Sequence, residues 1–268
     1  MSAYAACVLS NSHLAALKLA WTNRVFGARE DFTFDFFGAR TCMLKQVRRK
    51  GRSLVPRTGD AAERWRFTSG GKDRIDIDDY DALVVVACGF GIDVPKLRSQ
   101  CGTLAHSRFS RVENLVSAAC FEAASEEMFE ATGALHLIDL VRKMSELPIF
   151  LVAAPFISEV VLEREPYGED LHLSDRAALA AFVAQLRTVG ERVASRRRCE
   201  TIWQDQSTVA FPGFTRRAFN RDPARLDGRQ PKVKEFDDRH GNEDYGEIAM
   251  RQILRRLDEI SGGRVLAQ

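Results

Sequence analysis

The 268-residue sequence lacks several features that mark common classes of protein. Its six cysteines form no Cys-x-x-Cys pair and most lie in apolar segments, which is typical of reduced core thiols and argues against a zinc site or a disulfide framework. The 39 basic and 37 acidic side chains nearly cancel, so the charge gives no reason to expect a nucleic acid or an anionic membrane as a partner. No apolar run approaches the roughly 20 residues that span a bilayer.

Two further absences bear on location and on cofactors. Residues 1–6 carry no positive charge and Val8-Leu9 is too short for the apolar core of a signal peptide, so a cytoplasmic protein is expected. Neither a Gly-x-Gly-x-x-Gly nor a Walker-type loop occurs, and Gly89-Phe90-Gly91 alone is a weak signal for nucleotide binding. We therefore expect no cofactor and no metal.

Strand and helix patterns alternate along the chain without an internal repeat. The run 81–88 is continuously apolar and rich in valine, which is typical of a strand buried on both faces at the centre of a parallel sheet. Together the patterns predict a single α/β domain over 1–268, a three-layer α/β/α sandwich with a mainly parallel sheet of flavodoxin-like type. Strands are expected near 7–9, 32–37, 81–88, 147–155 and 201–202, and helices near 14–26, 111–146, 174–192 and 245–260.

Two segments interrupt this alternation. Residues 45–76 form an excursion that begins with the basic run 45–52, which is either a solvated face or a contact for a phosphate or an acidic glycan. The alternation in Trp65-Arg66-Phe67-Thr68 predicts a short hairpin within this excursion. Residues 209–235 form a long loop, and because long irregular segments are often lids or binding loops, we expect it to determine specificity.

The most informative stretch lies near the N-terminus. Residues 7–9 predict a buried strand, Ser10-Asn11-Ser12 a tight turn, and the residues from Leu14 onward a helix. Such a strand-turn-helix presents Ser12 at the carboxyl edge of the sheet, where ligands of α/β proteins bind and backbone N–H groups can stabilise negative charge. Ser12 is therefore a candidate nucleophile, although a serine before a helix also serves as an N-cap.

A serine nucleophile needs a base, and the far end of the chain offers one. Asp237 and His240 lie three residues apart in a segment that leads into the last expected helix. That spacing can place both side chains on one side of a loop, so that the carboxylate holds the imidazole in the correct tautomer. The sequence favours Asp237 over Asp238 only by this spacing.

These two terminal blocks resemble those of the SGNH (GDSL-like) hydrolase superfamily. The similarity is greatest to a bacterial variant whose first block reads Asn-Ser-His and whose last block contains His-x-Asn-x-x-Tyr-Gly, as in His240 to Gly246. The resemblance implies a serine ester hydrolase or acyltransferase that acts through an acyl-enzyme on a small-molecule or glycan ester, with an O-acetylated carbohydrate as the expected substrate class. It also implies an oxyanion hole built from backbone N–H groups of Ser12, Gly38 and the segment Gly89 to Gly91.

Two positions depart from the family pattern. Asn11 replaces the usual aspartate, which the family tolerates, and Gly91 stands where an asparagine completes the oxyanion hole. Loss of one oxyanion donor costs about 2.7 to 4 kcal/mol of transition-state stabilisation. A backbone N–H of Gly89, Phe90 or Gly91 can replace that donor, or the site is weak or lost.

Candidate substrate contacts flank these motifs. They are Asn11, His13 and Phe90, together with Phe211 and Phe214 of the long loop, whose rings pack over a sugar or fill the core. Two alternatives to an active esterase stay open, namely a degenerate domain of the same fold that binds glycan or protein without turnover, and a nucleotide-binding α/β domain. The sequence does not predict the oligomeric state.

Overall fold

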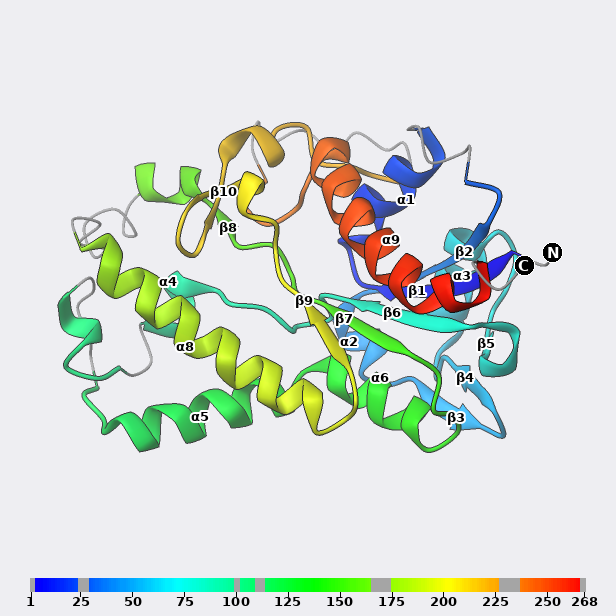
Figure 1. Cartoon of the computed structure of the whole chain (residues 1–268), viewed down its shortest axis with the longest axis horizontal. Coiled ribbons are helices and arrows are strands. Elements are labelled where there is room, and N and C mark those ends of the chain that lie inside the picture. The colour runs from blue at the N-terminus through cyan, green and yellow to red at the C-terminus, as the bar shows by residue number, and fades with distance from the viewer. Residues whose placement is uncertain are drawn as a thin grey trace.

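The computed structural model describes residues 3–23, 29–98, 102–108, 114–164, 175–226 and 237–265. Its centre is a five-stranded sheet of order β2-β1-β6-β7-β9, in which every neighbouring pair is parallel. The strands are β1 (Tyr4–Ser10), β2 (Phe32–Gly38), β6 (Ala82–Val86), β7 (Ile149–Val152) and β9 (Glu200–Ile202). Helices flank this sheet on both faces (Figure 1), which confirms the predicted three-layer α/β sandwich.

The valine-rich run predicted to be central is β6, the middle strand of the five, and all of its residues are buried. The register aligns the ends of three strands, because Ser10 of β1 lies opposite both Gly38 of β2 and Val86 of β6. The loops that follow β1, β2 and β6 therefore leave the sheet side by side at one edge. This edge is where ligands of open α/β sheets bind.

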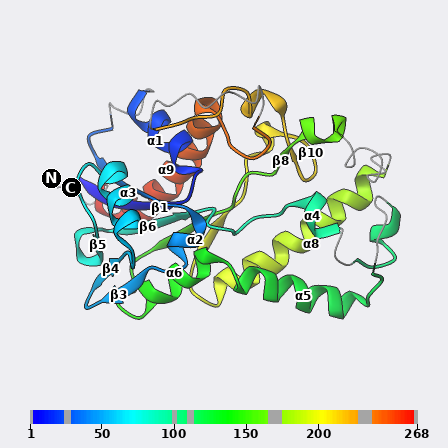
Figure 2. The same ribbon diagram turned by 180° about the vertical axis from the view of Figure 1, so that it is seen from behind.

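Alternate residues of each strand serve two separate cores. Helices α1 (Leu14–Asn23) and α9 (Glu243–Val265) cover the face to which Val8 and Val84 belong. Helices α3 (Gly59–Ser69), α5 (Ala118–Glu130), α6 (Gly133–Arg142) and α8 (Arg176–Ser195) contribute to the opposite core, which includes Leu9 and Val85. Figure 2 shows α1 and α9 on one side of the strands and α5, α6 and α8 on the other. Because successive side chains of a strand point to opposite faces of the sheet, each face packs against its own layer of helices.

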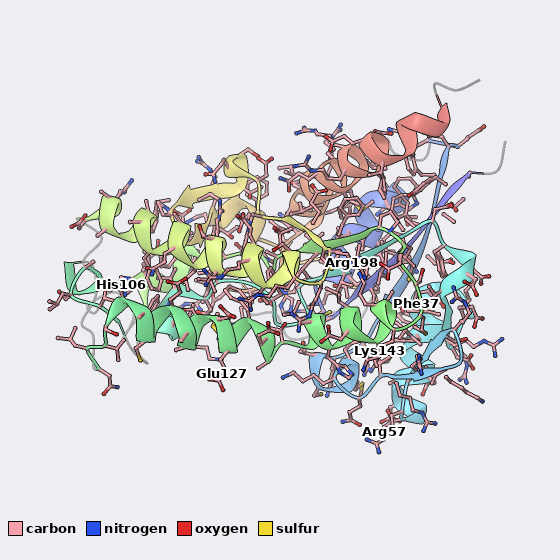
Figure 3. All side chains as sticks on the ribbon, turned by 60° about the horizontal axis from the view of Figure 1, so that its bottom comes forward. Phe37, Arg57, His106, Glu127, Lys143 and Arg198 are labelled. Carbon is pink, nitrogen blue, oxygen red and sulfur yellow. The ribbon has the colours of Figure 1, made fainter. Side chains whose placement is uncertain are left out.

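Helices α5 and α8 extend together beyond the sheet. Figure 3 shows them side by side, with Glu127 directed outward. Ion pairs join the two helices, including Arg192 to Glu122 at 2.6 Å and Arg192 to Glu126 at 3.2 Å. The helices expected within 111–146 are α5 and α6, and the Thr132 side chain caps the second of them by accepting from the N–H of Leu135.

The excursion at 45–76 corrects one prediction. Trp65 to Thr68 form no hairpin but lie within α3, which begins after the N-cap Thr58 and ends at Gly70 with φ of 80°. Trp65 is buried against Phe37, whereas Phe67 is 58% exposed, so the apparent alternation came from two positions on different faces of a helix. Strands β3 (Arg48–Lys50) and β4 (Ser53–Val55) precede this helix and β5 (Ile75–Asp76) follows it, and the three strands form a small sheet.

The basic run 45–52 is exposed and also holds neighbouring loops. Arg49 donates to the carbonyl of Lys143, and Arg52 donates to the carbonyl of Met144 while it pairs with Asp78. These contacts fix the end of α6 to the small sheet. The solvated-face interpretation therefore accounts for these arginines without a bound anion.

The long loop predicted at 209–235 is partly regular. Residues Val209–Phe211 form β10 and Phe214–Thr215 form β11, which pairs with β8 (Ile157–Ser158). Residues 227–235 of the predicted loop lie outside the described residues. The shorter elements are α2 (Thr41–Leu44), α4 (Val94–Arg98), and the 3-10 helices η2 (Ile77–Asp79), η3 (His106–Arg108), η4 (Glu159–Glu163), η5 (Gln206–Thr208) and η6 (Arg217–Phe219).

Five cysteines lie in the described residues and none forms a disulfide there. Cys7, Cys88 and Cys199 are buried, as expected of core thiols, whereas Cys42 and Cys120 are exposed and Cys101 lies outside the described part. None of the helices in the described ranges is both long enough and apolar enough to cross a bilayer.

Helices α1 and α9 approach so closely that Gly246 has no room for a side chain. A Cβ at this position would lie 2.0 Å from the carbonyl oxygen of Ala16. We expect Gly246→Ala to lower the free energy of unfolding by about 1–3 kcal/mol or more, because a backbone atom cannot move aside as a side chain can. Urea unfolding followed by circular dichroism measures this loss.

Gly262 of the same helix is the matched control, since a Cβ there meets no atom within 4 Å. Gly262→Ala is expected to leave stability unchanged or to raise it by up to about 1 kcal/mol, because alanine favours helix more than glycine does. Equal losses in the two variants would contradict the steric explanation.

Candidate active site

Ser12, His240 and Asp237 form a continuous chain of hydrogen bonds. The Ser12 hydroxyl lies 2.7 Å from Nε2 of His240, and Nδ1 of the same ring lies 2.7 Å from Oδ2 of Asp237. Ser12 is exposed, whereas the other two side chains are 29% and 22% exposed. The structure thus brings together the three residues that the sequence predicted as nucleophile, base and orienting carboxylate.

The carboxylate in this chain is Asp237 and not Asp238. Oδ1 of Asp237 accepts hydrogen bonds from the backbone N–H groups of Arg239 and His240, which leaves Oδ2 directed at the imidazole. Asp238 instead forms an ion pair with Arg164 at 2.7 Å. The three-residue spacing therefore identified the correct partner.

The surroundings of Asp237 keep it ionised. Burial alone would raise the pKa of this carboxyl group, but its hydrogen bonds from the His240 ring and from the backbone N–H groups lower the pKa well below its ordinary value. A permanent carboxylate fixes the tautomer in which Nδ1 of His240 carries a proton and Nε2 is the acceptor. Nε2 is then oriented to receive the proton of Ser12.

Neighbouring loops hold the segment that carries His240. The buried Asn220 donates from Nδ2 to the His240 carbonyl at 3.0 Å, and the N–H of Asn242 donates to the carbonyl of Phe219 at 2.8 Å. The N–H of Ser158 donates to the carbonyl of Asp238 on the other side. Residues of the 209–226 segment therefore position the backbone around His240, although His240 itself lies outside that segment.

Asn11 organises the turn that presents Ser12. Its Oδ1 accepts from the N–H of His13 at 3.2 Å, and its Nδ2 donates to the Thr41 hydroxyl at 3.0 Å. The first contact closes an Asx turn immediately before helix α1, and the second joins the turn after β1 to the start of α2. Asn11 thus lines the site, as predicted, and has a structural function in it.

His13 packs against the base. Its ring centroid lies 5.2 Å from that of His240, with the planes tilted by 37°. Burial, and then the nearby charge that His240 can carry, lower the pKa of His13 to about 3. His13 is therefore neutral near pH 7 and places no second positive charge beside the imidazole that must accept a proton.

The predicted oxyanion contribution of Gly38 needs correction. Its N–H donates to the Thr68 hydroxyl of helix α3 at 2.9 Å, so this donor is occupied in the structure. A Cβ on Gly38 would lie 2.6 Å from Cδ2 of Leu14, which shows that the glycine permits close packing of β2 against α1. Gly38 is adjacent to the nucleophile but does not offer it a free N–H.

Gly89 and Gly91 lie on the other side of Ser12 in a strained turn. Ala87, Cys88 and Gly89 all have positive φ, of 57°, 50° and 92°, a conformation that costs energy for the two residues with a side chain. A Cβ on Gly91 would lie 2.9 Å from that of Ala154, so an asparagine does not fit there unless Ala154 moves. The turn brings backbone, rather than a side-chain amide, to the site.

The predicted aromatic contacts are wrong. Phe90 is completely buried between Phe129 and Trp203, at 5.0 Å and 5.6 Å between ring centroids. Phe214 is also completely buried, and Phe211 stacks on it at 4.7 Å. None of the three predicted rings lines either of the two described cavities at Ser12, and for Phe214 the alternative of a place in the core is the correct one.

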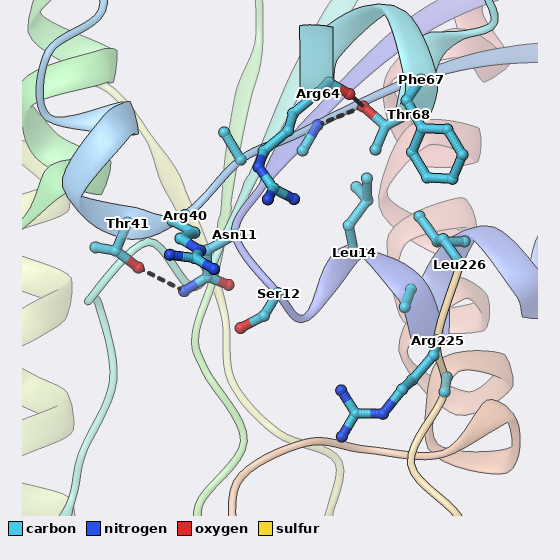
Figure 4. A pocket seen from close by; sticks show the side chains of 14 residues that line it. Asn11, Ser12, Leu14, Arg40, Thr41, Arg64, Phe67, Thr68, Arg225 and Leu226 are labelled. Carbon is cyan, nitrogen blue, oxygen red and sulfur yellow. Dashed lines mark hydrogen bonds between the residues drawn. The ribbon is translucent and has the colours of Figure 1, made fainter. Parts of the chain in front are cut away.

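Two cavities meet at Ser12. One, of about 420 Å³, is lined by His13, Gly89, Gly91, Lys96 and His240 among others. The second, of about 410 Å³, is lined on its polar side by Arg40, Thr41, Arg64, Thr68 and Arg225 (Figure 4). This second set is not recognisable from the sequence pattern. Arg64 and Thr68 line the site because they lie on α3, where the pattern predicts a hairpin.

No protein-family model and no curated protein matches the sequence. Three solved structures are similar in fold. A gut microbial diltiazem-metabolizing enzyme is 11% identical over 95% of this chain and 46% of its own length, with a TM-score of 0.42. The periplasmic domain of a lipopolysaccharide acetyltransferase from Salmonella ser. Paratyphi A is 11% identical over 95% of this chain and 84% of its own, with a TM-score of 0.43.

A protein from Lactobacillus plantarum is 13% identical over 97% of this chain and 98% of its own, with a TM-score of 0.42. This chain spans less than half the length of the diltiazem-metabolizing enzyme. At such low similarity, these structures indicate no activity for this chain, whose function has to be inferred from the geometry of the site and from the two terminal motifs.

The low pKa of His13 gives a direct prediction. Because the neutral form binds a proton only near pH 3, the two ring nitrogens of His13 should keep neutral-imidazole chemical shifts from pH 8 down to pH 5. Long-range ¹H–¹⁵N spectra of ¹⁵N-histidine protein measure these shifts, and His13→Asn assigns the signals. A His13 titration with its midpoint between pH 5 and 8 would refute this low pKa.

Proposed function

We propose that the chain is a serine-dependent ester hydrolase or acyltransferase of the SGNH (GDSL-like) type. The observation that carries the proposal is the hydrogen-bonded sequence Ser12, His240, Asp237, with both contacts at 2.7 Å. A serine that only capped helix α1 would have no need of an imidazole whose tautomer is fixed by a buried carboxylate. The arrangement matches that of an activated serine nucleophile.

The reaction begins when the Ser12 hydroxyl attacks the carbonyl carbon of an ester while Nε2 of His240 takes its proton. Asp237 stabilises the imidazolium that forms and keeps its orientation. When the tetrahedral intermediate collapses, His240 gives the proton to the departing alcohol and an acyl group remains on Ser12. Water or an acceptor alcohol, activated by the same imidazole, then releases the acyl group, which gives hydrolysis or transfer.

The oxyanion has its donors on two sides of the nucleophile. Ser12, Gly89 and Gly91 line the cavity that His240 also lines, and their backbone N–H groups are the proposed donors on that side. Asn11 adds a side-chain donor, because Nδ2 carries two hydrogens and Thr41 accepts one of them. In this proposal Asn11 replaces the asparagine that the family places at the position of Gly91.

The substrate class that we propose follows from the resemblance of the two terminal motifs to the SGNH (GDSL-like) superfamily. An O-acylated carbohydrate, with acetyl as the acyl group, is the proposed substrate, and the two cavities give room for a sugar on one side of Ser12 and for the acyl group on the other. A cytoplasmic location, a single domain and the absence of nucleic-acid and membrane partners stay predictions from the sequence.

A second function has support from two particular residues. Gly91 lacks the oxyanion side chain of the family, and the N–H of Gly38 is occupied by Thr68. Both features fit a degenerate domain that binds a glycan or a protein without turnover. The two functions differ in one property, which is whether Ser12 reacts as a nucleophile.

Labelling with a fluorophosphonate probe distinguishes them. We expect the intact protein to form an adduct on Ser12, located by mass spectrometry, and to hydrolyse 4-nitrophenyl acetate. Ser12→Ala, His240→Ala and Asp237→Asn should each lower kcat by about 10⁴-fold or more, because the three side chains act as one unit.

Ser195→Ala is the matched control, since Ser195 is exposed at the end of α8 and donates only to the carbonyl of Arg192. It should label and turn over as the wild type does. A folded protein that takes up no probe on Ser12, with all three variants indistinguishable from wild type, would leave the binding domain as the function.

A further inference from the structure

The cavity on the α3 side of Ser12 has an unusual distribution of charge. Among the residues that the structure describes, its lining contains three arginines, Arg40, Arg64 and Arg225, and no aspartate or glutamate. The three come from separate parts of the chain, namely the residue before α2, helix α3 and the segment after η6. Figure 4 shows their guanidinium groups around the space that Ser12 borders.

Two of these arginines have no counter-ion among the described residues. Across the residues that the structure describes, neither Arg40 nor Arg64 lies within 4 Å of a carboxylate, whereas Arg66 of the same helix pairs with Asp73 at 3.1 Å. Arg225 lies 3.6 Å from Oδ2 of Asp237, whose charge is already shared with His240. The cavity therefore concentrates positive charge next to the nucleophile.

General basicity does not explain this cluster. The whole chain has a net charge of only +2, and most of its other arginines on helices and loops are paired with carboxylates. Guanidinium groups that face one cavity repel each other unless an anion lies between them. Their planar N–H groups match the oxygens of a carboxylate or a phosphate, often with two parallel hydrogen bonds.

The remaining wall of the cavity is apolar. Phe67 is 58% exposed and Leu14, Ala15 and Leu226 also line it. An exposed aromatic ring at a cavity rim can pack against the flat apolar body of a ligand, such as a sugar face or an aromatic ring. The site thus offers one surface for an uncharged ring and one for an anion, both next to Ser12.

We infer that the substrate is an anionic ester, in which a carboxylate or a phosphate lies a few bonds from the acyl ester and is bound by Arg40, Arg64 and Arg225. This inference rests on the proposed function, because it names the substrate class of the same nucleophile. The anion belongs to the alcohol or to the acyl group of the ester, and the choice of probes separates these cases.

Four phenolic esters form the test set. Phenyl acetate is neutral, 4-acetoxybenzoate and 4-acetoxyphenyl phosphate carry the anion on the alcohol, and phenyl hydrogen succinate carries it on the acyl group. Each kcat/KM is divided by the second-order rate constant for hydrolysis of the same ester by hydroxide, which corrects for differences in chemical reactivity. The measured quantity is the preference for each anionic ester over phenyl acetate.

We expect the wild type to prefer at least one anionic ester by about tenfold or more, the usual size of a charge-assisted contact. Arg64→Met and Arg40→Met should each reduce this preference by about fivefold to tenfold, and Arg64→Lys should retain part of it. Arg66→Met, two residues away on α3 and paired outside the cavity, should leave the preference unchanged.

A wild type that hydrolyses all four esters with no preference for an anion would overturn the inference, as would a preference that persists in both Arg40→Met and Arg64→Met. Binding separates these outcomes from failure of the esterase proposal. Ligand-observed NMR on Ser12→Ala compares 4-acetoxybenzoate with phenyl acetate. If Ser12→Ala binds 4-acetoxybenzoate more tightly than phenyl acetate and Arg64→Met removes this difference, the anion site is upheld even where the wild type hydrolyses no ester. Equal binding of the two esters refutes the site.

Discussion

The contact between the first turns of α1 and α9 determines whether this chain has a site at all. Ser12 lies two residues before α1, and His240 lies three residues before α9. The nucleophile and the base therefore depend on how closely these two helices approach. At Gly246 they approach so closely that the space of a Cβ is taken by the backbone of Ala16. A hydrogen bond between residues 228 positions apart in the chain follows from packing near the start of each helix.

The sheet supplies the second constraint. Because β1, β2 and β6 end in register, the turns after them converge on Ser12, and each has a different task. The turn after β1 carries the nucleophile and is closed by Asn11. The end of β2 packs against α1 through Gly38, and the turn after β6 has positive φ at Ala87 and Cys88. Such strain is retained where a backbone must approach a ligand, and Gly89 and Gly91 are the residues that it brings to the cavity.

The sequence predicted the layers and the triad because both depend on local signals. The valine run of β6 and the turn before α1 are recognisable without tertiary contacts, and the spacing of Asp237 and His240 places carboxylate and imidazole on one side of a short loop. The excursion was harder, because Trp65 and Phe67 alternate with polar residues along the sequence, as the buried residues of a strand do, whereas in the helix only Trp65 is buried. Thr58 and Gly70, a helix N-cap and a left-handed C-terminal residue, were the signals that indicated a helix there.

The local charge of the cavity beside Ser12 cannot be predicted from the composition of the chain. A net charge of +2 is a sum over the whole chain, so it says nothing of a cavity whose described lining contains three arginines and no carboxylate. Arg40, Arg64 and Arg225 come from three distant parts of the chain, and only the fold places them together. The candidate residues for activating Ser12 could thus be recognised from two short motifs. The residues proposed to select its substrate could not, because only the tertiary structure determines which side chains surround Ser12.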